Sequence, residues 1–275
     1  MSAGSLSART EPLEVSRVPR WLDVSRPRAF SSHLALSAVL VGTVCALIFF
    51  VWYPHPYFQA VGAWSVLRIL VGVDLVLGPV LTLILFKPGK RGLKFDLCFI
   101  ACVQLAALVY GVTVIYNERP YVNVFALDRF TVYSYRDIDG EQWKNALAAG
   151  RLDAKPWRGP VLVVATKPTD LAGAQRLLDE TVFGGKPDID RRPEFWSRYE
   201  EQAAQVVRVQ RPLAALRAAR PDSAALIAAL PARLDRPESS LGFVAMIAKN
   251  RDVTMIVDAK TGEPLEVVDV DPWIG

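Results

Sequence analysis

The stretch Leu67-Arg-Ile-Leu-Val-Gly-Val-Asp-Leu-Val-Leu-Gly-Pro79 is apolar apart from one arginine and one aspartate. It belongs to a longer apolar run, Val66 to Phe86, which at about 1.5 Å per residue can cross a hydrocarbon core of about 30 Å. Two similar runs lie on either side of it, Leu34 to Tyr53 and Phe95 to Ile115. The first run is longer than the apolar core of a signal peptide and follows a long polar leader. The sequence therefore predicts three transmembrane helices, over about 34–53, 66–86 and 95–115.

Lysines and arginines in the short loops orient these helices. Five basic residues precede the first span, and four more lie between the second and third spans: Arg9, Arg17, Arg20, Arg26 and Arg28, then Lys87, Lys90, Arg91 and Lys94. The loop from Pro54 to Ser65 has no lysine or arginine. Because such residues are enriched in cytoplasmic loops, we expect a bacterial inner-membrane protein with its amino terminus in the cytoplasm. The expected parts are a disordered cytoplasmic leader (1–32), a membrane domain (33–116) and a periplasmic domain (117–275).

The charge of the chain divides along the same boundary. The whole chain has a formal net charge of +4, which could point to nucleic acid. From Asn117 onward, however, 22 lysines and arginines face 23 aspartates and glutamates. The basic excess therefore belongs to the leader and the loops of the membrane domain, where it sets orientation. We expect no nucleic-acid partner, and we expect contact with a phospholipid bilayer.

Residues 117–275 have the pattern of an α+β domain. Strand-like runs at 121–127, 130–135 and 160–166 alternate with helical runs at 141–149 and from about 170 to 182. An alanine-rich region follows, in which Pro212, Pro221 and Pro231 are expected to break the chain into short helices. Three more strand-like runs close the chain, at 241–248, 252–258 and 265–270. This order predicts a mixed, largely antiparallel sheet with helices on one face.

The inventory of reactive side chains argues against catalysis. The two histidines, His33 and His55, lie at the ends of the first span, and all three cysteines lie within spans. The periplasmic domain therefore cannot hold a serine or cysteine nucleophile activated by histidine, or a zinc site built on histidine or cysteine. Its acidic clusters, at 137–141 and 188–190, do not have the spacing of a complete EF-hand loop, and we interpret them as turn acids. We expect no enzyme, no metal and no cofactor.

Polar residues inside the membrane are the candidate interaction site. Asp74, Gly78 and Thr82 recur every four residues and so share one helix face, on which another transmembrane helix can pack closely. That helix could be the protein's own first or third span, with Gln104 opposite, or the helix of a partner. Arg68 is expected to extend toward the headgroups, and His33 is interpreted as an interfacial residue. The candidate partner contacts are Asp74, Gly78, Thr82, Arg68 and Gln104.

Several motifs resemble the type IV pilin accessory protein family (TfpX/TfpZ type). They are Pro-Arg-Ala-Phe30, Phe50-Val-Trp-Tyr-Pro54, the opening stretch with Phe86-Lys-Pro-Gly-Lys90, Leu93-Lys-Phe-Asp96, Gln104-Leu-Ala-Ala-Leu-Val-Tyr-Gly111, Asp258-Ala-Lys-Thr-Gly262 and Asp271-Pro-Trp273. The resemblance covers nearly everything from Arg28 to the end and is most specific in the second span and the loop after it. The leader up to about Pro27 resembles nothing in the family.

This resemblance implies a non-catalytic, chaperone-like inner-membrane protein that aids the stability, assembly or surface display of a type IV pilin. Before assembly, a pilin is held in the inner membrane by an apolar helix, with its head in the periplasm. We therefore expect the face of Asp74, Gly78 and Thr82 to contact the pilin helix and the periplasmic domain to contact the head. Other pilus assembly proteins are further candidate partners. The alternatives are a membrane sensor or ligand-binding protein and an enzyme that uses carboxylates.

Overall fold

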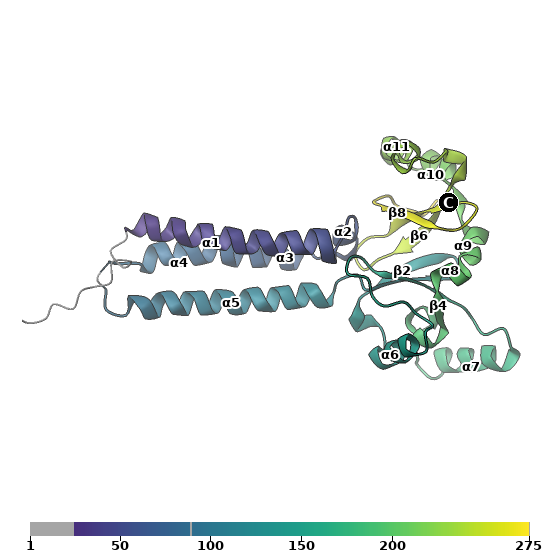
Figure 1. The fold of residues 1–275 in the computed structure, drawn as a ribbon, viewed down its shortest axis with the longest axis horizontal. Coiled ribbons are helices and arrows are strands. Elements are labelled where there is room, and N and C mark those ends of the chain that lie inside the picture. The colour runs from purple at the N-terminus through teal and green to yellow at the C-terminus, as the bar shows by residue number, and fades with distance from the viewer. Residues whose placement is uncertain (1–24, 89, 275) are drawn as a thin grey trace, which may run out of the picture.

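Three long helices run side by side and end against a sheet domain (Figure 1). The computed structural model describes residues 25–88 and 90–274. The three helical segments are α1 with η2 (Arg26–Leu47 and Ile48–Trp52), α3 with η3 and α4 (Trp64–Val71, Gly72–Leu77 and Gly78–Leu85), and α5 (Leu93–Asn117). Each is long and apolar enough to cross a membrane, which confirms the three predicted spans. The first helix begins at Arg26, earlier than predicted, because Pro27 suits a first helical turn. The expected leader falls largely on residues 1–24, outside the described residues.

The strands that follow the third span form one sheet. Its order is β4-β3-β1-β2-β6-β7-β8, and β5 pairs with β6. Two pairs are parallel, β1 with β3 and β2 with β6, and the other pairs are antiparallel. The predicted α+β fold with a mixed, largely antiparallel sheet is therefore confirmed. The strands are β1 (Val122–Ala126), β2 (Arg129–Tyr133), β3 (Val161–Ala165), β4 (Trp196–Arg198), β5 (Arg211–Pro212), β6 (Leu241–Ile247), β7 (Val253–Asp258) and β8 (Pro264–Val268).

One face of the sheet carries four helices, as the order of elements predicts. These are α6 (Gly140–Ala148), α7 (Leu171–Val182), α10 (Leu213–Ala219) and α11 (Ala224–Leu234). Alternation along the strands assigns the faces: Val122 and Val124 of β1 pack with Trp143 of α6, whereas Phe125 points to the opposite side. At the other end of the sheet, Phe243 and Ile256 pack with the buried leucines of α10 and α11.

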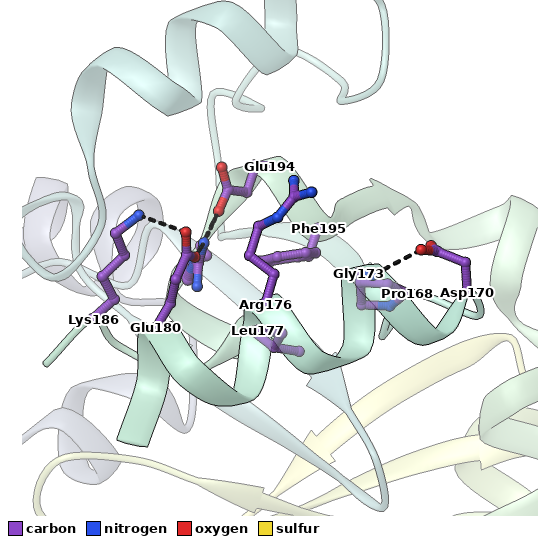
Figure 2. Close-up of a pocket in the computed structure, with 10 residues that line it drawn as sticks. Pro168, Asp170, Gly173, Arg176, Leu177, Glu180, Lys186, Glu194 and Phe195 are labelled. Carbon is purple, nitrogen blue, oxygen red and sulfur yellow. Dashed lines mark hydrogen bonds and ion pairs between the residues drawn. The ribbon is translucent and has the colours of Figure 1, made fainter. Parts of the chain in front are cut away.

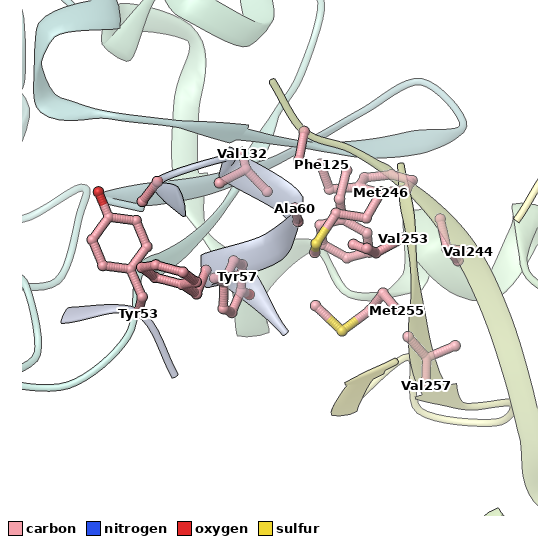
Figure 3. Packing of buried hydrophobic residues seen from close by; sticks show 14 of the residues in the cluster. Tyr53, Tyr57, Ala60, Phe125, Val132, Val244, Met246, Val253, Met255 and Val257 are labelled. Carbon is pink, nitrogen blue, oxygen red and sulfur yellow. The ribbon is translucent and has the colours of Figure 1, made fainter. Parts of the chain in front are cut away.

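The opposite face receives two short helices and the loop that joins the first two spans. The short helices are α8 (Tyr199–Gln202) and α9 (Ala204–Val209), and the loop contains α2 (Tyr57–Val61). Figure 3 shows Tyr57 and Ala60 of this loop beside Met246, Val253 and Met255 of the sheet. The loop between the spans is therefore part of the core of the sheet domain.

The alanine-rich region differs from the prediction at one proline. Pro212 and Pro221 begin new segments, but α11 continues through Pro231 to Leu234. Pro231 lies close to the end of the helix, and the buried Ile227 and Leu230 hold the preceding turns against the sheet. Packing thus outweighs the local cost of the proline. The remaining single turns are η4 (Tyr135–Asp137), η5 (Ile189–Arg191), η6 (Pro193–Phe195), η7 (Pro221–Ser223) and η8 (Glu238–Ser240).

Candidate interaction site

The face of the second span that bears Asp74, Gly78 and Thr82 points into the three-helix bundle. Asp74 and Thr82 are only 3% and 2% exposed. Asp74 belongs to η3, a π-helical segment between two α-helical segments, which is a feature often found at functional positions. We call these three residues, together with Gln104 and His33, the polar seam.

Gln104 of the third span lies directly on Gly78. A Cβ atom built on Gly78 would meet Gln104 Nε2 at 2.0 Å, so only glycine leaves room for this amide. Gln104 Nε2 makes long contacts of 3.4 Å to the backbone oxygen and to Oδ1 of Asp74. Asp74 Oδ2 and Gln104 Oε1 are buried and have no hydrogen-bond partner among the described residues. The polar seam therefore brings an acid and an amide together, but one oxygen of each side chain has no hydrogen bond among the described residues.

The first span closes the other end of the polar seam. Half-buried His33 of α1 places Nδ1 2.6 Å from Thr82 Oγ1. Ser37, one turn further along α1, is also buried. A histidine predicted to be interfacial thus also binds a threonine of the neighbouring helix. Both neighbouring spans contact the seam, which is the intramolecular alternative that the sequence left open.

Arg68 is separate from the other four candidate residues. Its side chain is exposed, and its Nε contacts the backbone oxygen of Trp64, 3.4 Å away, at the start of α3. Of the five candidates, the structure brings Asp74, Gly78, Thr82 and Gln104 together inside the bundle. Direct contact of those four with a partner helix requires the bundle to open. This contact remains a hypothesis.

A second interface, which was not predicted from the sequence, joins the spans to the sheet domain. We call the contact between residues 53–63 and the sheet the junction seam. Asn123 of β1 donates from Nδ2 to the Tyr57 hydroxyl at 2.5 Å, and both side chains are buried. The Tyr53 hydroxyl donates to the backbone oxygen of Ile115 at 2.6 Å and so ties this loop to the third span. Its sequence signal was the concentration of aromatic residues in a loop between two spans.

Backbone hydrogen bonds fix the far side of the junction seam. The amides of Asn250 and Arg251, in the turn between β6 and β7, both donate to the backbone oxygen of Ala60, at 2.9 and 3.1 Å. Gly62 has a φ of 84°, and a Cβ there would meet the Asn250 side chain at 2.9 Å. The left-handed backbone and the close approach together require glycine. The sheet and the loop between the spans therefore pack as one unit.

A cavity of about 420 Å³ lies beside α7 (Figure 2). At its wall, Arg192 bonds Glu194 and, at 2.5 Å, Glu180, while Lys186 bonds the other oxygen of Glu180. The hydrogen bonds from Arg192 and Lys186 lower the pKa of Glu180. The lining contains no serine, cysteine or histidine. The charges of Arg192, Lys186, Glu180 and Glu194 are paired with one another, so this part of the wall has a structural role.

The acidic clusters of the sheet domain have structural partners. Asp137 accepts from the amide and hydroxyl of Ser134, and Asp139 caps α6 through the amides of Glu141 and Gln142. Asp188 caps the single turn η5, and Asp190 accepts from the hydroxyl of Tyr133. No group of three or more metal-ligating side chains occurs within residues 25–88 and 90–274. Asp137, Asp139 and Asp188 thus bond to nearby backbone or side-chain groups in local turns, whereas Asp190 connects η5 to Tyr133 of β2.

Comparison with known proteins connects this architecture to fimbriae. Residues 20–62 match the model of a family described as fimbrial assembly protein FimB. Fimbrial assembly proteins of Dichelobacter nodosus serogroups I and E1 are each 36% identical over 185 residues, which cover 66% of this chain and 70% of theirs. A third relative, from serogroups C1 and C2, is 41% identical over 109 residues, or 38% of this chain and 82% of the relative. No solved structure matches the chain.

Proposed function

The chain belongs to the fimbrial assembly protein family, and from that premise we propose that it is a non-catalytic, chaperone-like accessory protein for a type IV pilin. Its role is in pilus assembly. It holds the pilin in the inner membrane before assembly, through one contact in the lipid and another outside it. The observation that carries the proposal is the junction seam, which joins a three-span bundle to an exported domain in one unit.

A partner that must hold a membrane-anchored subunit needs contact surfaces on both sides of the lipid boundary, held in a fixed relation. A flexible linker between anchor and domain would let the two contacts act independently. Here the two parts share a core, so a pilin bound to both would be held in one orientation. Basic residues at the opposite end of the spans support a cytoplasmic amino terminus and a periplasmic sheet domain.

Within the membrane, the polar seam is covered by the protein's own helices, so a partner helix would contact side chains that face the lipid. Tyr110 of α5 is 73% exposed, although its hydroxyl lies in the apolar region of the third span. An exposed tyrosine there offers a hydrogen bond to a polar group of another helix. Leu108, on the same helix, is buried against the first two spans and provides a matched interior position.

Outside the membrane, α7 offers the corresponding surface. It lies at the end of the exported domain farthest from the spans (Figure 1). Leu171, Leu178 and Val182 line its exposed side, and Phe183 follows its last turn at 82% exposure. Exposed apolar side chains grouped on one helix face are typical of protein contact sites. We assign this face to the pilin head.

The experiment is photo-crosslinking in the native host with the major pilin as the detected product. A photoreactive amino acid is placed at Tyr110 or at Phe183, and Leu108 serves as the buried control. We expect a crosslink to the pilin from both exposed positions and none from Leu108. Absence of pilin from both exposed positions, in cells that still make pili, would contradict the proposal. A crosslink from Leu108 would show instead that the bundle opens to receive the pilin helix.

A further inference from the structure

The loop between α6 and β3 returns from the exported domain to the ends of the spans. At its tip, the position of a Cβ on Gly159 would lie 3.9 Å from Pro54, just beyond the end of the first span. Trp157, two residues earlier, is 80% exposed, and Arg158 is exposed as well. Tryptophan and arginine are the residues that proteins place at the boundary between lipid and water. The loop therefore has both the location and the chemistry of a membrane-surface contact.

Two cations near this loop share one aromatic ring. Arg119 follows the third span, and its guanidinium carbon lies 5.5 Å from the ring centre of Tyr121. Lys155 of the loop places Nζ 5.6 Å from the same ring centre. Arg119 also stacks on Tyr116, in the last turn of α5, with 3.6 Å to the ring centre. Both cations are thus fixed at the level where α5 ends.

The positive charge at this position is not compensated by the described part of the chain. Neither Arg119 nor Lys155 forms an ion pair there; Lys155 donates instead to the backbone oxygens of Pro156 and Gly159. Partial burial, and then the charge of Arg119, lower the pKa of Lys155 to about 8. An arriving anion would relieve the repulsion between the two side chains.

More basic residues lie around the same end of the spans. Arg136 and Lys249 share the carboxylate of Glu118, at 3.3 and 2.9 Å. Arg251 bonds Gln59 of the loop between the first two spans and also forms an ion pair with Asp269. Within a domain of nearly balanced charge, basic side chains therefore gather where the sheet meets the membrane. Such a band attracts anionic lipid surfaces.

We propose that Arg119 and Lys155 bind the phosphate of an anionic phospholipid, with Trp157 set in the headgroup layer beside it. The lipid would hold the α6–β3 loop against the bilayer and so fix the exported domain at a second point besides the junction seam. The occupant is a lipid and not a soluble anion, because the pair lies at the end of α5 beside an exposed tryptophan. This inference stands independently of the pilin proposal.

The test uses the full chain in detergent, titrated with phosphatidylglycerol and observed by native mass spectrometry. The double variant Arg119→Gln, Lys155→Gln is compared with Lys167→Gln, Arg176→Gln, which removes two exposed cations with no ion pair among the described residues, beside the start of α7 and on it. At about 1 kcal/mol per basic residue near a lipid surface, each lost charge corresponds to a weakening of about fivefold. We expect the first double variant to bind phosphatidylglycerol about 25-fold more weakly and the second to bind like the unchanged protein.

Two further arms identify the ligand and control for folding. Phosphatidylcholine and inorganic phosphate are titrated in parallel, and we expect both to bind more weakly than phosphatidylglycerol. Hydrogen exchange of the sheet reports whether the variants remain folded. In nanodiscs, residues 154–160 of the unchanged protein should exchange more slowly with phosphatidylglycerol present. Equal phosphatidylglycerol binding by the two folded double variants would overturn the proposal, as would binding of inorganic phosphate with equal strength.

Discussion

The polar seam and the junction seam join parts of one chain in two different solvents. Inside the membrane, the helices meet through a glycine, an acid, an amide and a threonine–histidine contact. At the junction, outside the spans, the loop and the sheet meet through buried tyrosine, phenylalanine, methionine and valine. Burying apolar surface stabilises only where water is the alternative, and lipid offers helices no such gain. Each seam therefore uses the contacts that its own solvent makes favourable.

The largest effect is expected from removing an aromatic side chain of the junction seam. Phe58 is 4% exposed, and its ring centre lies 4.6 Å from that of Phe49 and 5.0 Å from that of Trp64. Phe58→Ala should lower the free energy of unfolding of the sheet domain by about 3–5 kcal/mol, through lost burial and the cavity left behind. Thermal unfolding of the two proteins in nanodiscs, monitored through hydrogen exchange of the sheet, measures this loss.

Phe183→Ala is the matched control for that substitution, because the same side chain is lost from a position that is 82% exposed. We expect a change within about 0.5 kcal/mol. If the two variants unfolded alike, the loop between the spans would contribute little to the core of the domain. The claim that the junction seam is stabilised by buried apolar side chains would then be wrong.

A smaller effect is expected at the glycine of the polar seam. The Cβ of Gly78→Ala would displace the Gln104 amide, which can move, but Asp74 would then lose its side-chain contact with Gln104. We expect a loss of about 1 kcal/mol in bundle stability, the range found for hydrogen bonds between membrane helices. Gly72→Ala is the control, since its Cβ would meet nothing within 4 Å. Unfolding of the bundle in mixed micelles should separate the two variants, and equal stability would contradict the close packing at Gly78.

The sequence predicted the polar seam better than the junction seam, for physical reasons. A charged residue in an apolar run is conspicuous, and the spacing of Asp74, Gly78 and Thr82 placed them on one face. Spacing says which residues share a face but not what covers it, so packing on the protein's own spans and packing on a partner helix were both left open. In the structure, Gln104 and His33 show that the protein's own spans contact this face, and contact with a partner helix stays a hypothesis.

The junction seam was hidden because its two halves lie far apart in sequence. Tyr57 and Asn123 are separated by 66 residues, and nothing in a short loop indicates that its aromatic residues enter a sheet domain. The strands of that domain were predictable from their alternation, and so were the helices on one face. The burial of both faces was not, because a largely antiparallel sheet often leaves one face to solvent.

A pH-dependent effect is expected at the junction seam. Burial raises the pKa of Tyr57 to about 12, and the hydrogen bond from Asn123 offsets this only in part. In the unfolded chain a tyrosine ionises near pH 10, so between about pH 10 and 12 the unfolded state binds fewer protons than the folded state. Stability contributed by the neutral hydroxyl is therefore complete below pH 10 and falls as the pH rises toward 12. Tyr57→Phe should flatten this part of the profile, measured by chemical denaturation at each pH. An unchanged slope would show that this tyrosine is not buried at the junction.

The smallest effect is expected where the first span meets the polar seam. Thr82→Val keeps the shape of the side chain and removes the hydroxyl that lies 2.6 Å from His33 Nδ1. Hydrogen bonds between membrane helices contribute about 0.6 kcal/mol on average, since the separated helices also find partners, and we expect a loss of that size. Thr113→Val is the control, because within the described residues its hydroxyl bonds only the backbone of its own helix, at Val109. A loss of about 3 kcal/mol, comparable with that of Phe58→Ala, would mean that polar contacts in the lipid stabilise this protein as strongly as aromatic burial does at the junction.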